Sequence, residues 1–160
     1  MMGEFATTTA MFNRSTGIVE KTTEGIPAEK WLLQPAADSN HLLWIAGHVV
    51  VHRAMAAKLL GAEWSAPWEK LFSRGTKRID AGQYPPVSEI QNAWKEVSEK
   101  LAAVLANPDK ECISKPAAQG APSLDGTVGG LVSFLCLHEI YHVGQMGYVR
   151  KWLGYGQPLG

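Results

Sequence analysis

The chain is short of cysteine, of net charge and of long apolar runs, and each shortage excludes a class of protein. Only two of its 160 residues are cysteine, too few for a disulfide framework. Fifteen basic and fifteen acidic side chains cancel, and no block of Lys and Arg would attract a nucleic acid. No apolar run reaches membrane-spanning length, and the first ten residues lack the order of a signal peptide. We therefore expect a cytoplasmic protein with no nucleic-acid or membrane partner.

The composition and the spacing of apolar residues predict a single all-α domain over residues 1–160. Hydrophobic residues make up 46% of the chain and charged residues 19%, as in globular proteins. Apolar residues recur three and four positions apart, and no alternating strand pattern is present. The expected long helices cover residues 3–24, 39–60, 88–106 and 127–153, with a helical turn within 28–34. Four such helices joined by loops predict an antiparallel four-helix bundle.

Local signals predict where two of the helices begin and how the longest connection behaves. Ser39 or Asn40 is expected to cap the second long helix, and Ser88 with Gln91 forms a capping box for the third. Residues 61–86 contain four aromatic side chains, so we expect a folded segment rather than a floppy connector.

The last predicted helix is apolar around nearly its whole circumference, which favours a central position or contact with a second subunit. Its apolar residues away from the histidines include Phe134, Leu137, Tyr141, Tyr148 and Trp152. Gly144 and Gly147 would each cost this helix about 1 kcal/mol relative to alanine unless another backbone approaches closely. These features suggest a homodimer.

His138 and His142 are the most informative pair in the chain. They are four residues apart, so both imidazoles project from one helical face, and that face carries core residues. A buried polar group without a partner costs about 1–3 kcal/mol. A shared divalent metal ion would satisfy both imidazoles, whereas the alternative is a pair of core histidines that hydrogen-bond to hydroxyls or backbone.

Two known metal motifs match this run only in part. The sequence from His138 to His142 reads HEIYH and fits the HExxH pattern of zinc proteases, but no His, Asp, Glu or Cys follows His142 to act as a third ligand. The same run contains one ExxH element of the kind found in di-iron bundles, which need a second such element that this chain lacks. We therefore expect the third ligand upstream of His138.

The second predicted helix is the other source of histidine. His48 lies mid-helix at a buried position and is our choice as the third ligand, with His52 as the alternative ligand or a supporting group. His41, beside the helix start, is expected at the surface or as a cap. Three neutral imidazoles leave one coordination position open, as in catalytic rather than structural sites.

Two further residues are candidates for a catalytic role. Glu139 is 100° around the helix from His138 and is a candidate general base or a partner that orients an imidazole; the alternative is a partly exposed residue in a salt bridge. Gln145 shares the face of His138 and His142, so it is a candidate for contact with a ligand or substrate, or an amide that only packs between helices.

Two runs of the sequence around these histidines resemble those of the DinB-like superfamily of damage-inducible bundle proteins. They are NHLLWIAGH, which ends at His48, and HEIYHVGQ, which starts at His138. The turn AEKWLLQPA before the second helix and the ending YVRKWLG also suit that family. The resemblance covers about residues 3–154 and implies an up-down-down-up bundle, often a homodimer.

The resemblance implies a divalent ion, Zn²⁺ or Ni²⁺ for preference, held by three histidines that correspond here to His48, His138 and His142. Characterised members of the family include S-transferases that use bacillithiol or mycothiol and a thiol-dependent maleylpyruvate isomerase. The implied function is a metal-dependent thiol S-transferase, or a hydrolase, that uses a low-molecular-weight thiol and a small-molecule substrate. The alternative is a non-catalytic metal-binding dimer with a structural or sensor role.

Overall fold

The computed structural model describes residues 5–77 and 79–159, and these form a bundle of four long helices. The helices are α1 (Ala6–Thr23), α2 (Leu42–Leu59), α3 (Val87–Ala106) and α5 (Val128–Trp152), with the short α4 (Lys110–Ser114) before α5. Three single turns of 3-10 helix lie in the connections, at Ala28–Lys30, Glu69–Phe72 and Ala81–Gln83. The all-α prediction is confirmed, although the expected start of the first helix at Gly3 lies outside the described residues. Among the described helices, none is both long and apolar enough to cross a membrane.

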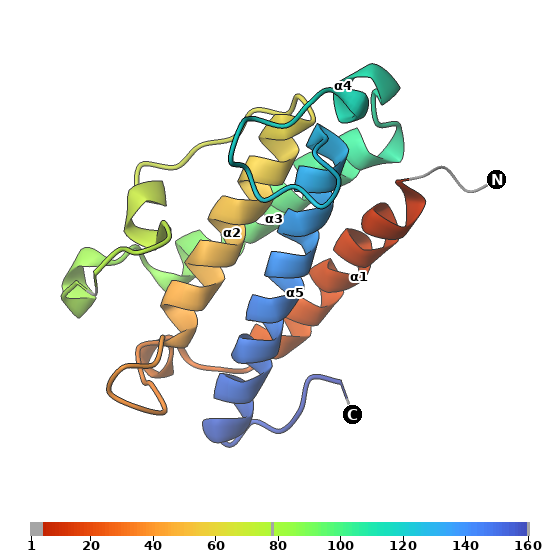
Figure 1. The fold of residues 1–160 in the computed structure, drawn as a ribbon. Coiled ribbons are helices and arrows are strands. Elements are labelled where there is room, and N and C mark those ends of the chain that lie inside the picture. The colour runs from red at the N-terminus through yellow and green to blue at the C-terminus, as the bar shows by residue number, and fades with distance from the viewer. Residues whose placement is uncertain (1–4, 78, 160) are drawn as a thin grey trace.

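The four long helices are arranged so that α5 lies between α1 and α2, while α2 lies between α5 and α3 (Figure 1). Shared apolar clusters give the helix directions. Ala46 and Ile90 belong to one cluster, and Ala57 and Leu105 belong to the other, so α2 and α3 run parallel. The connection between them therefore crosses the length of the bundle, which accounts for its 61–86 span.

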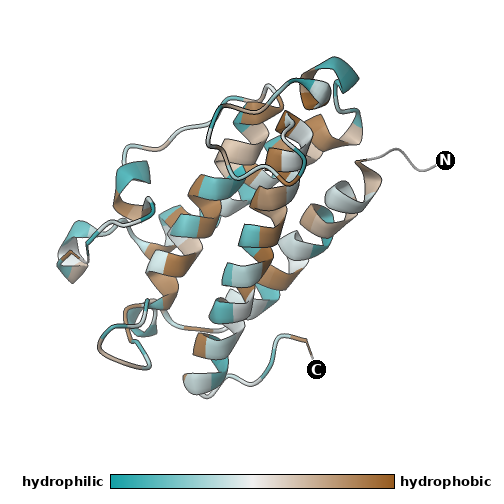
Figure 2. Cartoon of the chain, viewed as in Figure 1, coloured by the Kyte–Doolittle hydropathy of each residue, from teal (hydrophilic) through white to brown (hydrophobic). Residues whose placement is uncertain are grey.

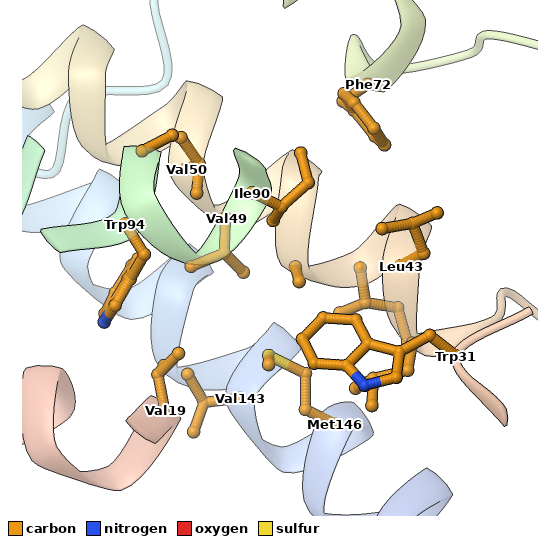
Figure 3. Packing of buried hydrophobic residues seen from close by; sticks show 14 of the residues in the cluster. Val19, Trp31, Leu43, Val49, Val50, Phe72, Ile90, Trp94, Val143 and Met146 are labelled. Atoms are coloured by element: carbon orange, nitrogen blue, oxygen red, sulfur yellow. The ribbon is translucent and has the colours of Figure 1, made fainter. Parts of the chain in front are cut away.

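The core is contributed by all four long helices. Figure 3 shows Val19, Trp94, Val143 and Met146 pointing toward one another from α1, α3 and α5. Figure 2 shows brown, apolar bands at several levels of α2 and α5. In α2 the six consecutive residues 45–50 are all buried, which is more than one full turn. Burial alone therefore selects no single inward face for this helix.

The helix starts differ from the predicted caps. His41, rather than Ser39 or Asn40, caps α2, and its Nδ1 accepts a hydrogen bond from the backbone N–H of Trp44 at 3.1 Å. The capping box predicted at Ser88 is wrong, because α3 begins one residue earlier after Pro86 and has no side-chain cap. Pro86 fixes its own φ at a value that suits a helix entrance. Asp109 caps α4, a helix that lies in the predicted loop 107–126.

One buried arginine contacts all of the other three long helices. On α2, Arg53 donates from Nε and Nη2 to the two carboxylate oxygens of Glu139 on α5, at 2.9 and 2.6 Å. Its Nη1 donates to Thr16 Oγ1 on α1 and Ser98 Oγ on α3, both at 2.7 Å, and Nη2 also donates to the Phe12 carbonyl at 3.1 Å. All five N–H groups are satisfied. We call Arg53, Glu139, Thr16, Ser98 and the Phe12 carbonyl the Arg53 clamp.

Gly47 allows the 61–86 segment to lie close against α2. A Cβ atom at Gly47 would come within 2.5 Å of ring carbons of Phe72, which is fully buried. Within the described part of the chain, no other backbone approaches Gly144 or Gly147: nothing lies within 4 Å of a Cβ at Gly144, and a side-chain carbon of Pro158, at 3.8 Å, meets one at Gly147. Close approach within the chain therefore explains Gly47, and the cost of the two glycines in α5 is not offset in this way within one chain.

We predict that Gly47→Ala destabilises the protein, because the Phe72 ring is enclosed and cannot move aside. Overpacking of this kind costs about 1–3 kcal/mol, more than the helix gains from alanine. Gly17→Ala in α1 is the matched control, since open space surrounds that position, and it should stabilise by up to about 1 kcal/mol. Urea unfolding of both variants measures the difference. Equal stabilisation by both substitutions would contradict this account of Phe72.

Candidate metal centre

Three imidazoles converge between α2 and α5. His48 comes from the middle of α2, and His138 and His142 come from consecutive turns of α5. The Nε2 atom of His138 lies 3.4 Å from Nε2 of His48 and 3.1 Å from Nε2 of His142. The ligand atoms of all three histidines lie within 4.8 Å of one another. Imidazole nitrogens bound tetrahedrally at 2.0–2.1 Å from a Zn²⁺ ion would be about 3.3 Å apart, so the separations suit a common ion.

Hydrogen bonds at the other ring nitrogen fix which nitrogen of two histidines carries the proton. Nδ1 of His48 donates to the backbone carbonyl of Phe72 at 2.6 Å, because a carbonyl can only accept. Nδ1 of His142 faces the amide oxygen of Gln145 at 2.8 Å and donates to it. In both neutral rings the lone pair is therefore on Nε2, which is the atom that faces the other histidines.

His138 shows that these rings do not satisfy one another. Its Nδ1 is buried and has no hydrogen-bond partner among the described residues. One proton on its Nε2 can serve only one of the two lone pairs that face it, and it leaves Nδ1 as a bare acceptor. Three nitrogen donors around one point, with too few protons between them, are the arrangement that a cation satisfies.

Burial keeps the imidazoles uncharged at neutral pH. Desolvation lowers the pKa of His48 to about 3 and that of His138 to about 4, and it also lowers the pKa of His142. The neighbouring histidines act in the same direction on each ring, and the charge of Arg74 adds to the effect on His138. Protons therefore compete little for the lone pairs at pH 7.

The other two histidines lie outside this group of three. The ring of His52 packs 4.1 Å from that of His48 and 4.4 Å from that of His138, and its Nδ1 donates to the His48 carbonyl at 2.9 Å. His52 therefore supports the ligand rings by contact. His41 is buried at the start of α2, so the expectation of a cap is confirmed and that of a surface position is wrong.

The two candidate catalytic residues have different surroundings. Glu139 is 1% exposed rather than partly exposed, and both of its oxygens accept from Arg53, so its geometry favours a structural role over a general base. Gln145 contacts His142 through its oxygen, and its Nε2 donates to the Tyr141 hydroxyl at 3.2 Å. It therefore orients the His142 ring and also lines the wall of a cleft beside it.

A cleft of about 530 Å³ is lined in part by Gln145, whose amide oxygen contacts His142. Its wall includes Asn40, Ile45, Tyr141 and Tyr148. Trp44 stacks on the His48 ring, with centroids 4.6 Å apart and an interplanar angle of 17°. The space is large enough for a small molecule.

Neither cysteine belongs to the centre. Cys136 is buried, and desolvation raises the pKa of its thiol to about 12, so it stays protonated at neutral pH. Cys112 is half-buried, and its thiol donates to the Leu59 carbonyl at 3.3 Å, away from the histidines. A thiol nucleophile at this site would therefore come from a bound molecule.

A comparison with families of known proteins finds a match over most of the chain. A sequence profile of the DinB superfamily matches residues 11–146, which include all three histidines and most of the bundle. A search of curated proteins finds no match. On the profile match and the bundle that it covers, the chain belongs to the DinB superfamily.

Proposed function

We propose that the protein binds one divalent metal ion through His48, His138 and His142 and uses it to activate a thiol or a water molecule. The observation that carries this proposal is the convergence of three Nε2 atoms that lack enough protons to satisfy one another. Imidazole ligands suit Zn²⁺ and Ni²⁺, and three protein ligands leave a position open for a further group. When bound, the ion supplies Lewis acidity, which lowers the pKa of a coordinated thiol or water.

The residues around the centre have supporting roles in this proposal. Phe72 and Gln145 hold His48 and His142 with their lone pairs turned inward. The cleft beside Gln145, with Asn40 and Tyr141 in its wall, would hold a small electrophilic substrate on the Gln145 side of His142. The reaction that fits is transfer of a low-molecular-weight thiol to that electrophile, and hydrolysis is the reaction if water takes the place of the thiol.

We predict that the untagged, metal-free protein takes up one Zn²⁺ or Ni²⁺ ion per chain. Loss of a residue that supports a ligand lowers metal affinity by about 10- to 100-fold. We expect a larger loss of affinity in each of the three ligand variants, His48→Ala, His138→Ala and His142→Ala. His52→Ala is the matched control, because this ring touches the ligands without joining them, and it should keep the stoichiometry. Calorimetric titration and elemental analysis measure both quantities. Unchanged uptake by the three ligand variants would refute the assignment.

We also predict metal-dependent turnover of a thiol with a haloaromatic or an epoxide. The rate should fall to the uncatalysed level after chelation and in His48→Ala, while His52→Ala retains a metal-dependent rate. The assay follows loss of the free thiol. If chelation lowers the melting temperature but no combination of thiol and electrophile reacts, the metal ion has a structural or sensor role instead. A bound ion at one hundred times its Kd stabilises a fold by about 2.7 kcal/mol in either case.

We further propose that a second copy of the chain covers the outer face of α1 and α5. Leu137, Ile140 and Tyr148 on α5 and Met11 on α1 are exposed there. Grooves of about 410 and 440 Å³ run along the same face and share Ile140 in their walls. In a twofold dimer, the same apolar face of each chain packs against that of its partner and is removed from water.

If this proposal is right, Ile140→Glu shifts the protein from dimer to monomer, because each copy would place a charge in the apolar interface. Sedimentation velocity over a range of concentrations measures the change. Met55→Glu on α2 is the control, since Met55 is also exposed but lies on another helix. A wild-type protein that stays monomeric at every concentration would rule out the interface.

A further inference from the structure

We infer that the Arg53 clamp positions the metal ligands by fixing the rotation of α2 and α5 about their own axes. This inference rests on the proposed metal function, because it concerns the geometry of the same centre. It assigns Arg53 and Glu139 as positioning residues, with Thr16 and Ser98 as their anchors on the other two helices.

Apolar packing alone does not fix this rotation. Residues 45–50 of α2 are buried on every side of the helix, and α5 carries apolar residues on its exposed side, at Leu137 and Ile140, as well as on its buried side. The gain from burying apolar surface depends on area and has no direction. Two helices with apolar residues on most sides can therefore rotate against each other at little cost unless a directional contact opposes it.

The Arg53 clamp supplies that directional contact. The guanidinium is planar, and its paired N–H groups meet the Glu139 carboxylate side by side, at 2.9 and 2.6 Å. Thr16 and Ser98 hold Nη1 from the other side at 2.7 Å each. The rings of Trp94 and Phe12 lie 3.9 and 5.6 Å from the guanidinium carbon, so it has little room to move.

The clamp is close enough to the ligands for their orientations to be linked. Glu139 directly follows His138 and precedes His142 by three residues, so all three lie within about 6 Å of one another along the axis of α5. Arg53 follows His48 by five residues on the same uninterrupted helix, a rise of about 7.5 Å. Because each helix moves as a rigid rod over so short a span, the contact between Arg53 and Glu139 also sets the directions of the imidazoles.

Metal affinity should be more sensitive to this rotation than folding is. The Nε2 separations of 3.1 and 3.4 Å match those that one ion requires, and sites of this kind fail when ligands shift by about 1 Å. A bundle packed through apolar side chains tolerates such a shift. Loss of the clamp should therefore be evident in the bound metal before it is evident in stability.

The test is titration of the full-length, metal-free protein with Co²⁺, followed by its visible absorption bands, for the wild type and for Arg53→Met/Glu139→Leu. The double variant removes both charges together and leaves neither unpaired, so it should fold with similar or greater stability. We expect its Co²⁺ affinity to fall by about 10- to 100-fold and its absorption bands to shift. A purely structural pair would change the unfolding midpoint and leave the spectrum of the folded protein unchanged.

A milder pair of variants decides the matter if the double variant does not fold. Ser98→Ala removes one acceptor of Arg53 Nη1, whereas Ser15→Ala removes a buried hydroxyl without a hydrogen-bond partner among the described residues. Ser98→Ala should weaken Co²⁺ binding and Ser15→Ala should not. Wild-type affinity and spectrum in the folded double variant, or in Ser98→Ala if the double variant does not fold, would overturn the inference. Failure of the wild type itself to bind Co²⁺ would instead overturn the proposed metal function.

Discussion

Burying Arg53 and Glu139 removes two charges from water, which costs several kcal/mol for each ion before any contact forms. The cost is offset only if every donor finds an acceptor, and here all five N–H groups do. Those acceptors come from three helices, so the arrangement is complete only when the whole bundle has assembled. The ion pair is therefore stable only in the correctly assembled bundle. The apolar contacts around it have no such requirement.

The histidine cluster depends on the opposite electrostatic condition. His48 and His142 are buried and His138 is half-buried, and all three rings are neutral. His48 and His142 each donate from one ring nitrogen to an oxygen, so that the other nitrogen faces inward. One of those oxygens is a main-chain carbonyl from the 61–86 segment and the other is a side-chain amide one turn along α5. Two unrelated parts of the chain therefore prepare a single set of lone pairs, and this preparation precedes any ligand.

Much of the fold could be predicted because it follows from local periodicity. The four long helices repeat apolar residues at helical spacing. The four-residue separation of His138 and His142 predicts that both lie on one helical face. His48 could be chosen because the second long helix is the only upstream segment that contains histidine. Local reasoning was less successful at helix starts, since it offered Ser39 and Asn40 as well as His41 for the cap of α2, and the proline before α3 leaves no polar signal.

The partners of these residues could not be predicted, for a different reason. Arg53 and Glu139 are 86 residues apart, and a lone charge in an apolar helix does not indicate which distant carboxylate it meets. Glu139 was therefore open to several roles until its contact was known. The oxygen that orients His48 belongs to a backbone carbonyl, a group that every residue carries and that leaves no trace in the sequence.

That carbonyl has a practical consequence for redesign of the centre. Whatever residue occupies position 72 brings the same oxygen, so no exchange of a side chain there can delete the bond to His48. A substitution can only displace it, by altering how the chain runs across Gly47. The orientation of this imidazole and the position of its proton therefore depend on the path of the 61–86 segment across α2, and exchange of the whole segment is the way to change them.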